Sequence, residues 1–316
     1  MSDTTTSLPT SSSSTSPAYT LSQLQSILNV AEEAARLAGA IILQHAGNID
    51  IDKEKAGYQD LVTAADKACQ NIIEETIKNY YPDHNILGEE SVEAGYLAST
   101  AAINNLLTTS TTTSSSPSSS SVTSPWLWII DPIDGTTNFI HGVPCSVVSI
   151  GIAYNGIMVV GCIYEPYRNE MFTAIQNQGT YLNKKRVKVS NQETKLSQAL
   201  LGYGLHHTHL VGNLMIQGLS IMLLHTRGCR SLGSAALHLA YVSCGRLTGF
   251  WELDLAAWDI AAGSLLVMEA GGKITDTQGN PYTLRTRNTL ATNGKEEIHN
   301  EIVRLLKEKH ADHVPR

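Results

Sequence analysis

Apolar residues recur every three or four positions after Thr20, which predicts one long amphipathic helix near the start of the chain. Thr20 and Gln23 form a capping-box pattern, and Gly47 ends the run. The same spacing predicts a second helix from Thr63 to about Tyr80. Four more helices are expected later in the chain, near residues 210–224, 233–244, 257–270 and 296–309.

The middle of the chain is rich in strand signals. Two β-branched runs within residues 145–164 are joined by Asn155-Gly156, the strongest short signal for a β-hairpin. The segments 170–175 and 180–190 suggest a further antiparallel pair, and strands and helices alternate after residue 200. Antiparallel strands followed by mixed elements predict layered sheets and helices in an α+β fold.

Two stretches lack residues that could form a packed core. Residues 1–19 are rich in Ser, Thr and Pro, and residues 108–124 are almost entirely Ser and Thr. Such compositions bury too little apolar surface to offset the entropy cost of ordering. We therefore expect a disordered tail at 1–19, a single domain over 20–312, and a disordered insertion at about 100–124.

Composition and charge narrow the class of protein. The 316 residues carry a formal net charge of −7, which argues against a nucleic-acid-binding surface or a polybasic membrane-binding surface. The longest apolar stretch is interrupted by Asn155, and the first basic residue is Arg36, so we expect neither a membrane span nor a targeting peptide. Five widely spaced cysteines without a C-x-x-C pair favour a reducing, cytoplasmic location.

Candidate chemistry begins where an apolar run ends, at Asp131. Asp131 and Asp134 lie three residues apart, and both carboxylates can bind a hard cation through oxygen. Gly135 permits close approach to the backbone, and the amides of Gly135 and Thr136 could face an anion if a helix begins there. The alternative is an ordinary strand-to-helix turn, because Asp, Pro, Gly and Thr all favour turns and caps.

Further acidic residues occur in three other places. Glu89 follows the apolar pair at 86–87, Glu252 ends a strand-like run, and Asp259 lies where a helix begins. Each has an ordinary alternative: Glu89 and Glu252 as surface residues, and Asp259 as a helix-capping residue. Asp66 could likewise cap the helix that starts near Thr63.

Five ordered segments resemble a known family when they are taken together. They are D-L-V-T-A-A-D (60–66), G-E-E-S (88–91), D-P-I-D-G-T (131–136), R-S-L-G-S-A-A (230–236) and W-D-I-A-A-G (258–263). This order is similar to that of the inositol monophosphatase family, within the wider group that contains fructose-1,6-bisphosphatases and bisphosphate nucleotidases. The resemblance runs from about residue 25 to 310, and the late segments favour the inositol monophosphatase branch.

The resemblance implies a layered α-β-α-β-α sandwich, a homodimer, two or three Mg²⁺ ions and inhibition by Li⁺. It implies that the metal ligands are Glu89, Asp131, Asp134, Asp259 and the carbonyl of Ile133. It implies that the catalytic residues are Glu89, Asp66 and Thr136, with Thr136 and Asp66 orienting the attacking water. It implies that the substrate is bound by Gly135, Thr136, Ala235, Glu252 and Asp259.

The expected function is hydrolysis of myo-inositol monophosphates by Mg²⁺-activated water, with a small phosphorylated polyol as the ligand. Histidinol phosphate, a sugar 1-phosphate or a bisphosphate is the alternative substrate, and an inactive phosphate-binding scaffold is the alternative of another class. His206, His207 and His209 match no segment of the family pattern. Their spacing lacks a convincing fourth zinc ligand, so a polar loop at a helix entry is the simpler interpretation.

Overall fold

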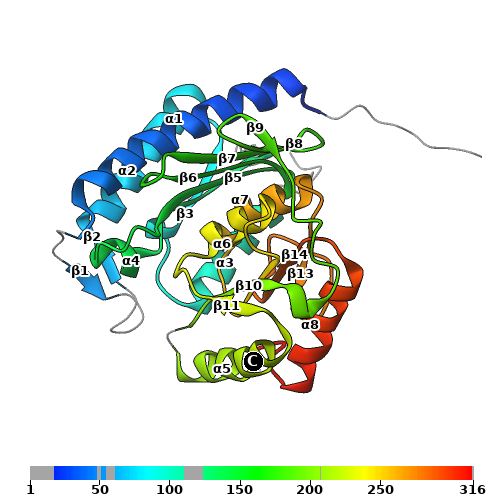
Figure 1. Cartoon of the computed structure of the whole chain (residues 1–316). Helices are drawn as coiled ribbons and strands as arrows, with labels where there is room; N and C mark the ends of the chain where they lie inside the picture. Colours follow the sequence, from blue (N-terminus) through cyan, green and yellow to red (C-terminus); the bar gives the residue numbers. More distant parts are fainter. Residues whose placement is uncertain (1–17, 48–50, 55–60, 110–123, 207, 315–316) are drawn as a thin grey trace, which may run out of the picture.

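Alternating layers of helix and sheet build the protein, and the computed structural model describes residues 18–47, 51–54, 61–109, 124–206 and 208–314 (Figure 1). The larger sheet has seven strands in the order β3-β4-β5-β6-β7-β8-β9. Its strands are β3 (Asn85–Gly88), β4 (Trp126–Asp134), β5 (Val147–Tyr154), β6 (Ile157–Glu165), β7 (Glu170–Ile175), β8 (Gly179–Leu182) and β9 (Lys185–Val187). Strands β3 and β4 are parallel, and the other neighbours are antiparallel.

The second sheet has five strands in the order β11-β10-β12-β14-β13. Its strands are β10 (Leu200–Tyr203), β11 (Gly228–Arg230), β12 (Gly249–Glu252), β13 (Lys273–Asp276) and β14 (Thr289–Thr292). A separate antiparallel pair is formed by β1 (Ile51–Glu54) and β2 (Leu61–Thr63).

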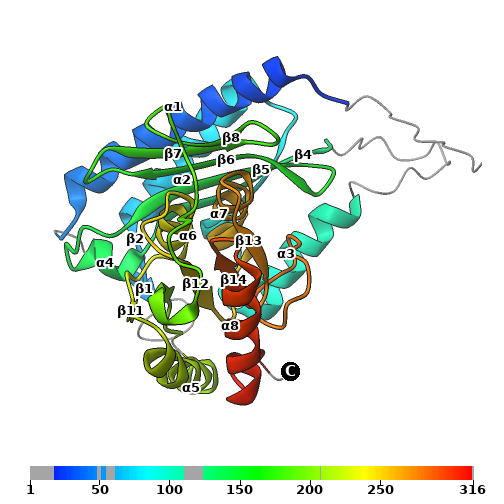
Figure 2. The ribbon, with the colours of Figure 1, turned by 45° about the vertical axis from the view of Figure 1, so that its right-hand side comes forward.

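The helices complete the layers. The outer face of the large sheet is covered by α1 (Leu21–His45) and α2 (Ala64–Tyr80), and the outer face of the second sheet by α5 (His209–His225) and α8 (Glu296–Glu308). Between the sheets lie α6 (Ala235–Ser243) and α7 (Ala257–Glu269), with α3 (Tyr96–Thr109) at the edge of this middle layer (Figure 2). The short α4 (Thr136–Ile140) follows β4. This α-β-α-β-α order confirms the expected architecture. Among the described helices, none combines the length and apolarity needed to span a bilayer.

Strand β4 shows why the large sheet is buried on both faces. Trp128 and Ile130 pack in the core formed with α1 and α2, whereas Leu127 and Ile129 pack in the core formed with α6 and α7. This alternation follows from the two-residue period of a strand. The continuous apolar run before Asp131 therefore places the first candidate carboxylate at the end of a central, fully buried strand.

Two glycines allow α7 to lie directly on the large sheet. Gly151 of β5 and Gly161 of β6 face each other across the strand pair. A Cβ atom on Gly161 would lie 2.7 Å from the Ala262 carbonyl oxygen, and one on Gly151 would lie 2.9 Å from the Ala262 nitrogen. The helix backbone therefore rests where any side chain would displace it, and this contact fixes the start of α7 relative to the sheet.

Most local predictions are confirmed. Thr20 accepts a hydrogen bond from the Gln23 amide at 3.2 Å, which completes the capping box of α1. Asn155 and Gly156 both have positive φ, as a tight hairpin turn between β5 and β6 requires. The four expected later helices correspond to α5, α6, α7 and α8. The segment 180–190 forms two strands, β8 and β9, rather than one.

Two boundaries of the expected disorder are wrong. Tyr19 belongs to the folded domain, because its ring packs on Tyr154 at 5.0 Å and its hydroxyl donates a hydrogen bond to Gln176 at 2.7 Å. Residues 100–109 belong to α3, because Ile103 and Leu107 lie one helical turn apart and bury against the middle layer. The remaining parts of both predictions, 1–17 and 110–123, lie outside the described residues.

The glycine contact under α7 generates a first prediction. Gly161→Ala should destabilise the protein by about 1–3 kcal/mol and lower the melting temperature by about 2–5 °C, because the new methyl group overpacks against the Ala262 carbonyl. Gly228→Ala is the matched control, since its nearest neighbour is the flexible Arg230 side chain at 3.3 Å. Equal melting temperatures for the two variants would contradict the contact.

Candidate active site

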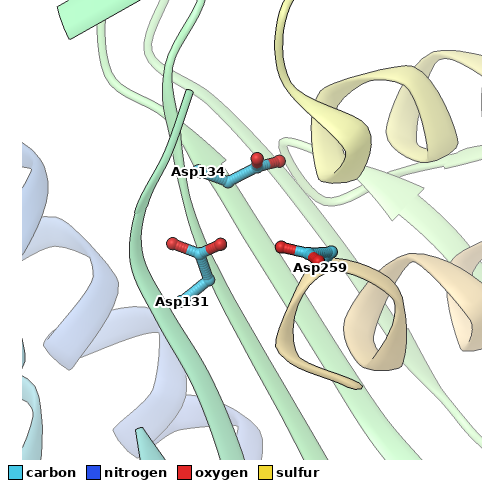
Figure 3. A group of neighbouring side chains, drawn as sticks. All are labelled: Asp131, Asp134 and Asp259. Carbon is cyan, nitrogen blue, oxygen red and sulfur yellow. The ribbon is translucent and has the colours of Figure 1, made fainter. Parts of the chain in front are cut away.

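Three aspartates converge where β4 ends and α7 begins; Asp131 and Asp134 are buried, and Asp259 is partly buried. Asp131 and Asp134 come from the end of β4, and Asp259 comes from the first turn of α7 (Figure 3). One carboxylate oxygen of each lies within 4.8 Å of those of the other two. Residues three apart in a regular strand face opposite sides, but the pairing of β4 with β5 shifts register between Asp131 and Asp134. This irregularity lets both carboxylates face α7.

Glu89 adds a fourth carboxylate beside this triad. It begins the short 3₁₀ helix Glu89–Ser91 directly after β3, which runs parallel to β4 and pairs Gly88 with Ile130. Because the ends of parallel strands meet at one edge of a sheet, Glu89 lies next to Asp131. The Glu89 charge accordingly contributes to raising the pKa of Asp131.

The negative charges of the three aspartates are not balanced by nearby positive charge, and their pKa values are raised as a result. Burial, followed by the charges of Glu89, Asp134 and Asp259, raises the pKa of Asp131 well above its ordinary value. Burial raises the pKa of Asp134 to about 6, although hydrogen bonds from Ser234 and Ala236 oppose the shift. Burial and the Asp134 charge raise the pKa of Asp259 to about 8. Hard oxygen ligands with uncompensated negative charge suit a divalent cation such as Mg²⁺.

Two of the aspartates also bind helix N-termini. The Oδ2 atom of Asp134 accepts hydrogen bonds from the Ser234 hydroxyl at 2.7 Å and from the Ala236 amide at 2.6 Å, at the start of α6. The Oδ2 atom of Asp259 accepts from the Ala256 amide at 2.6 Å, at the start of its own helix. The capping alternative for Asp259 is therefore correct, and it coexists with membership of the acidic triad.

The turn after Asp134 brings a hydroxyl and a carbonyl together. The Thr136 hydroxyl lies 3.1 Å from the Ile133 carbonyl oxygen and 3.5 Å from an Asp66 carboxylate oxygen. Gly135 has φ +96°, and a Cβ atom there would lie 2.9 Å from the Cys145 carbonyl oxygen. Only glycine fits this left-handed position, and it leads directly into α4.

A cleft of about 580 Å³ opens from the acidic triad towards the second sheet. Ala235 and Glu252 line it, so the structure brings the expected substrate contacts beside the expected metal ligands. The Glu252 side chain is 9% exposed, and burial, with the charges of Asp259 and Asp134, raises its pKa well above the ordinary value. Its carboxyl group occupies the place that a side chain on Gly204 would take. Glu252 is therefore a buried cleft residue, and its alternative as a surface residue is wrong.

The far side of the cleft contains Ser99, Asp254 and Arg287, which the sequence did not single out, together with His206. Arg287 donates from Nε to an Asp254 carboxylate oxygen and from Nη1 to the Ser99 hydroxyl, both at 2.9 Å. Asp254 adopts φ +65°, and its carboxylate lies 3.8 Å from Nε2 of His206. These residues come from four separate segments, so no local pattern could have identified them.

Of the histidines near residue 206, the described ones, His206 and His209, belong to no group of three or more possible metal ligands. His206 lines the cleft, His209 begins α5 behind its cap residue Thr208, and His207 lies outside the described residues. Within the described ranges, the aspartate triad is the one group of three or more His, Cys, Asp or Glu side chains close enough to share a metal.

Comparison with known proteins agrees with this arrangement. The model of the inositol monophosphatase family matches residues 23–311. The chain belongs to this family. It is 39% identical over 292 residues to the inositol-1-monophosphatase of Synechocystis sp., with 92% of each chain covered. It is 37% identical to the Nus factor SuhB of Pseudomonas aeruginosa, with 86% of this chain and 93% of that protein covered.

A solved structure supports the same assignment. The Thermotoga maritima IMPase superposes with a TM-score of 0.74 and 32% identity, over 90% of this chain and 98% of that one. The resemblance inferred from the five segments is thereby confirmed. As a member of the inositol monophosphatase family, the protein is a phosphoric monoester hydrolase, and the family is metal-dependent.

The raised pKa values generate a second prediction, on stability. A carboxyl whose folded-state pKa is raised stabilises the fold below its ordinary pKa, and that stabilisation is lost as pH rises through about 6 for Asp134 and about 8 for Asp259. Divalent cations bind the ionised form. Adding Mg²⁺ should therefore raise the melting temperature more at about pH 8.5 than at about pH 5.5.

The expected size of the gain is about 2.7 kcal/mol when the free cation is a hundredfold above its Kd. Thermal melts in chelator and in excess Mg²⁺ measure it at both pH values. Asp259→Asn should reduce the gain at high pH, whereas Asp83→Asn, an exposed aspartate elsewhere, should leave it unchanged. A gain of the same size at both pH values would contradict the assignment of the triad as a cation site.

Proposed function

We propose that the protein hydrolyses myo-inositol monophosphates to inositol and phosphate with the help of Mg²⁺. The observation that carries the proposal is the cleft in which the aspartate triad continues into Ala235 and Glu252. A cation site beside a cleft wall that carries the Glu252 carboxylate suits a phosphorylated polyol, whose phosphate needs cations and whose hydroxyls need hydrogen-bond acceptors. The name of the Synechocystis relative supports this choice of substrate.

In this proposal the Mg²⁺ ligands are Glu89, Asp131, Asp134, Asp259 and the Ile133 carbonyl. When bound, the ions neutralise the phosphate dianion and increase the acidity of water at the site. The bulge between Asp131 and Asp134 gives these two carboxylates a common direction. Asp134 and Asp259 keep one oxygen on a backbone amide, so each carboxylate is held in a defined orientation.

Thr136 orients the attacking water in this proposal. Its hydroxyl has one proton, and both neighbouring oxygen atoms, on Ile133 and Asp66, are acceptors for that proton. The hydroxyl therefore presents a lone pair to any water in the cleft and can accept a hydrogen bond from it. Asp66 keeps the Thr136 proton directed away from the water.

The two ends of the substrate are bound by different loops. The amides of Gly135 and Thr136, at the start of α4, are placed to bind phosphate oxygens. Ala235 and the Glu252 carboxylate are placed to meet the hydroxyls of the polyol. A second phosphate would need another cationic group, but Arg287, the one guanidinium among the described cleft residues, already binds Asp254 and Ser99. This favours a monophosphate over a bisphosphate.

The proposal is tested with a panel of phosphate monoesters assayed for phosphate release with and without Mg²⁺. Inositol monophosphates should be turned over with the highest kcat/KM, and chelation should abolish the activity. The panel includes histidinol phosphate, a sugar 1-phosphate and a bisphosphate. A higher kcat/KM for any of these would overturn the choice of inositol, and no release from any substrate would favour a phosphate-binding scaffold.

A third prediction concerns the metal ligands. Asp134→Asn should lower kcat by at least about a hundredfold, because it removes a charged ligand while the amide oxygen can still accept from Ser234 and Ala236. The melting temperature in chelator should change little. Asp83→Asn serves as the matched control and should retain activity. Near-normal phosphate release by Asp134→Asn would show that this ligand assignment is wrong.

A fourth prediction concerns substrate choice. Glu252→Gln should reduce kcat/KM for inositol monophosphate by about tenfold to a hundredfold, because a charge-assisted hydrogen bond to a hydroxyl contributes roughly 1.5–3 kcal/mol. Turnover of 2-glycerophosphate, which lacks the ring, should change much less. Equal losses on both substrates would indicate damage to the metal site, and no loss on either would remove Glu252 from substrate binding.

A further inference from the structure

The backbone of Leu232 is held by two side chains, one from α6 and one from α4. Its N–H donates a hydrogen bond to Nε2 of His238 at 3.1 Å, and its carbonyl accepts one from Nδ2 of Asn138 at 2.7 Å. Asn138 also donates to the Cys145 carbonyl at 2.8 Å. Leu232 lies in the loop 231–234 that leads into α6, and Asn138 lies in α4. The Asn138 bond therefore ties α4 to this loop, and the His238 bond ties the loop to α6.

His238 is fixed in both position and tautomer. It is fully buried, and its ring stacks on Phe250 with centroids 4.7 Å apart and planes 10° apart. Its Nδ1 atom lies 2.6 Å from the Ser234 carbonyl oxygen, which can only accept, so Nδ1 carries the proton. Nε2 is then an acceptor for the Leu232 N–H. Burial lowers the pKa of His238 to about 4, so the ring is neutral near neutral pH.

The other face of the ring lies against the backbone of the second sheet. A Cβ atom on Gly202 of β10 would lie 2.5 Å from Cδ2 of His238. The imidazole thus lies on the sheet over the Gly202 backbone of β10, beside the Phe250 ring of the neighbouring strand β12. This packing holds both ring nitrogens of His238 in fixed positions for their hydrogen bonds.

The loop that His238 holds also orients a residue of the acidic triad. Ser234, whose carbonyl binds His238, donates its hydroxyl to Oδ2 of Asp134 at 2.7 Å. The Ala236 amide donates to the same oxygen at 2.6 Å. A displacement of loop 231–234 would move both donors, and the Asp134 carboxylate would lose the two bonds that set its direction.

We infer that His238 is a positioning residue for the metal site. Together with Asn138 it clamps the Leu232 peptide, and through Ser234 it directs the Asp134 carboxylate towards Asp131 and Asp259. The inference rests on the proposed function only in taking Asp134 as a metal ligand. A buried histidine that served packing alone would contribute to stability and leave cation binding unchanged.

The test compares three substitutions of His238. His238→Leu removes the contacts of the ring with Leu232 and Ser234, together with the 3.3 Å contact of Nε2 with the Arg230 carbonyl oxygen. His238→Gln keeps an acceptor near the position of Nε2, and His238→Asn keeps a donor near the position of Nδ1. The measurements are the Kd for Mg²⁺ alone by calorimetry, kcat and KM for 2-glycerophosphate, and the melting temperature. All binding and kinetic experiments are made well below the lowest melting temperature of the set.

Two further variants complete the set. Asn138→Ala releases the other side of the clamp. His299→Leu is the matched control, because His299 is also buried and also binds two partners, the hydroxyls of Thr275 and Thr292, in the second sheet. It should lower the melting temperature without changing Mg²⁺ affinity.

His238→Leu and Asn138→Ala should each weaken Mg²⁺ binding by about tenfold or more and lower kcat with a smaller change in KM, as loss of a residue that orients a metal ligand does. His238→Gln should recover most of the affinity, because it can still accept from the Leu232 N–H. If His238→Leu fails to fold, the Gln and Asn variants and Asn138→Ala still decide the question.

Three outcomes would overturn the inference. The first is a His238→Leu protein that is less stable but binds Mg²⁺ normally, as His299→Leu should. The second is a His238→Asn protein that recovers Mg²⁺ affinity while His238→Gln does not. That result would show that the contact with the Leu232 N–H does not position the metal site. The third is normal Mg²⁺ affinity in Asn138→Ala. Failure of the proposed function is distinguishable, because the wild-type protein would then release no phosphate from any substrate.

Discussion

Mutual repulsion among buried carboxylates is the constraint around which this structure is arranged. Asp131, Asp134 and Asp259 place oxygen atoms within 4.8 Å of one another in the interior, where each uncompensated charge costs several kcal/mol. The backbone supplies part of the compensation. Asp134 and Asp259 accept amides at the starts of α6 and α7, and Asp131 accepts the Ile133 amide at 3.1 Å. In the proposed function, bound cations would supply the rest, and the metal would then contribute to the stability of the fold as well as to its chemistry.

The layered architecture provides part of the compensation for the negative charge of the triad. The two helices between the sheets both begin at the cleft, so the partial positive charges of two N-termini point at one group of acids. The large sheet contributes Glu89, Asp131 and Asp134 from the ends of β3 and β4, and the second sheet contributes Glu252 from the end of β12. Neither sheet alone holds both the acidic triad and Glu252, so the cleft is complete only where the layers meet.

The sequence predicted those features that depend on neighbouring residues. The α1 capping box, the hairpin at Asn155-Gly156 and the strand that ends at Asp131 each have their signal within a few positions. Features that depend on distant partners had no such local signal. The contact of Arg287 with Asp254 and Ser99, and the glycine pair beneath α7, arise only when separate segments pack. Grouping Glu89, Asp134 and Asp259 required the family resemblance, since spacing alone left each an ordinary turn, surface or capping residue.

The two strand glycines beneath α7 restrict which mutations the protein can accept. Gly151 and Gly161 let α7, and Asp259 with it, lie close to the sheet, and the Ala256 amide then orients the Asp259 carboxylate. A core substitution that removes atoms elsewhere leaves the backbone surface at Gly151 and Gly161 unchanged. A methyl group added at either glycine would displace α7 and the Asp259 carboxylate together. Engineering that gains stability by replacing strand glycines with larger residues would therefore work against catalysis at these two positions. At these two glycines every substitution adds atoms, so every substitution acts against the close approach of α7 to the sheet.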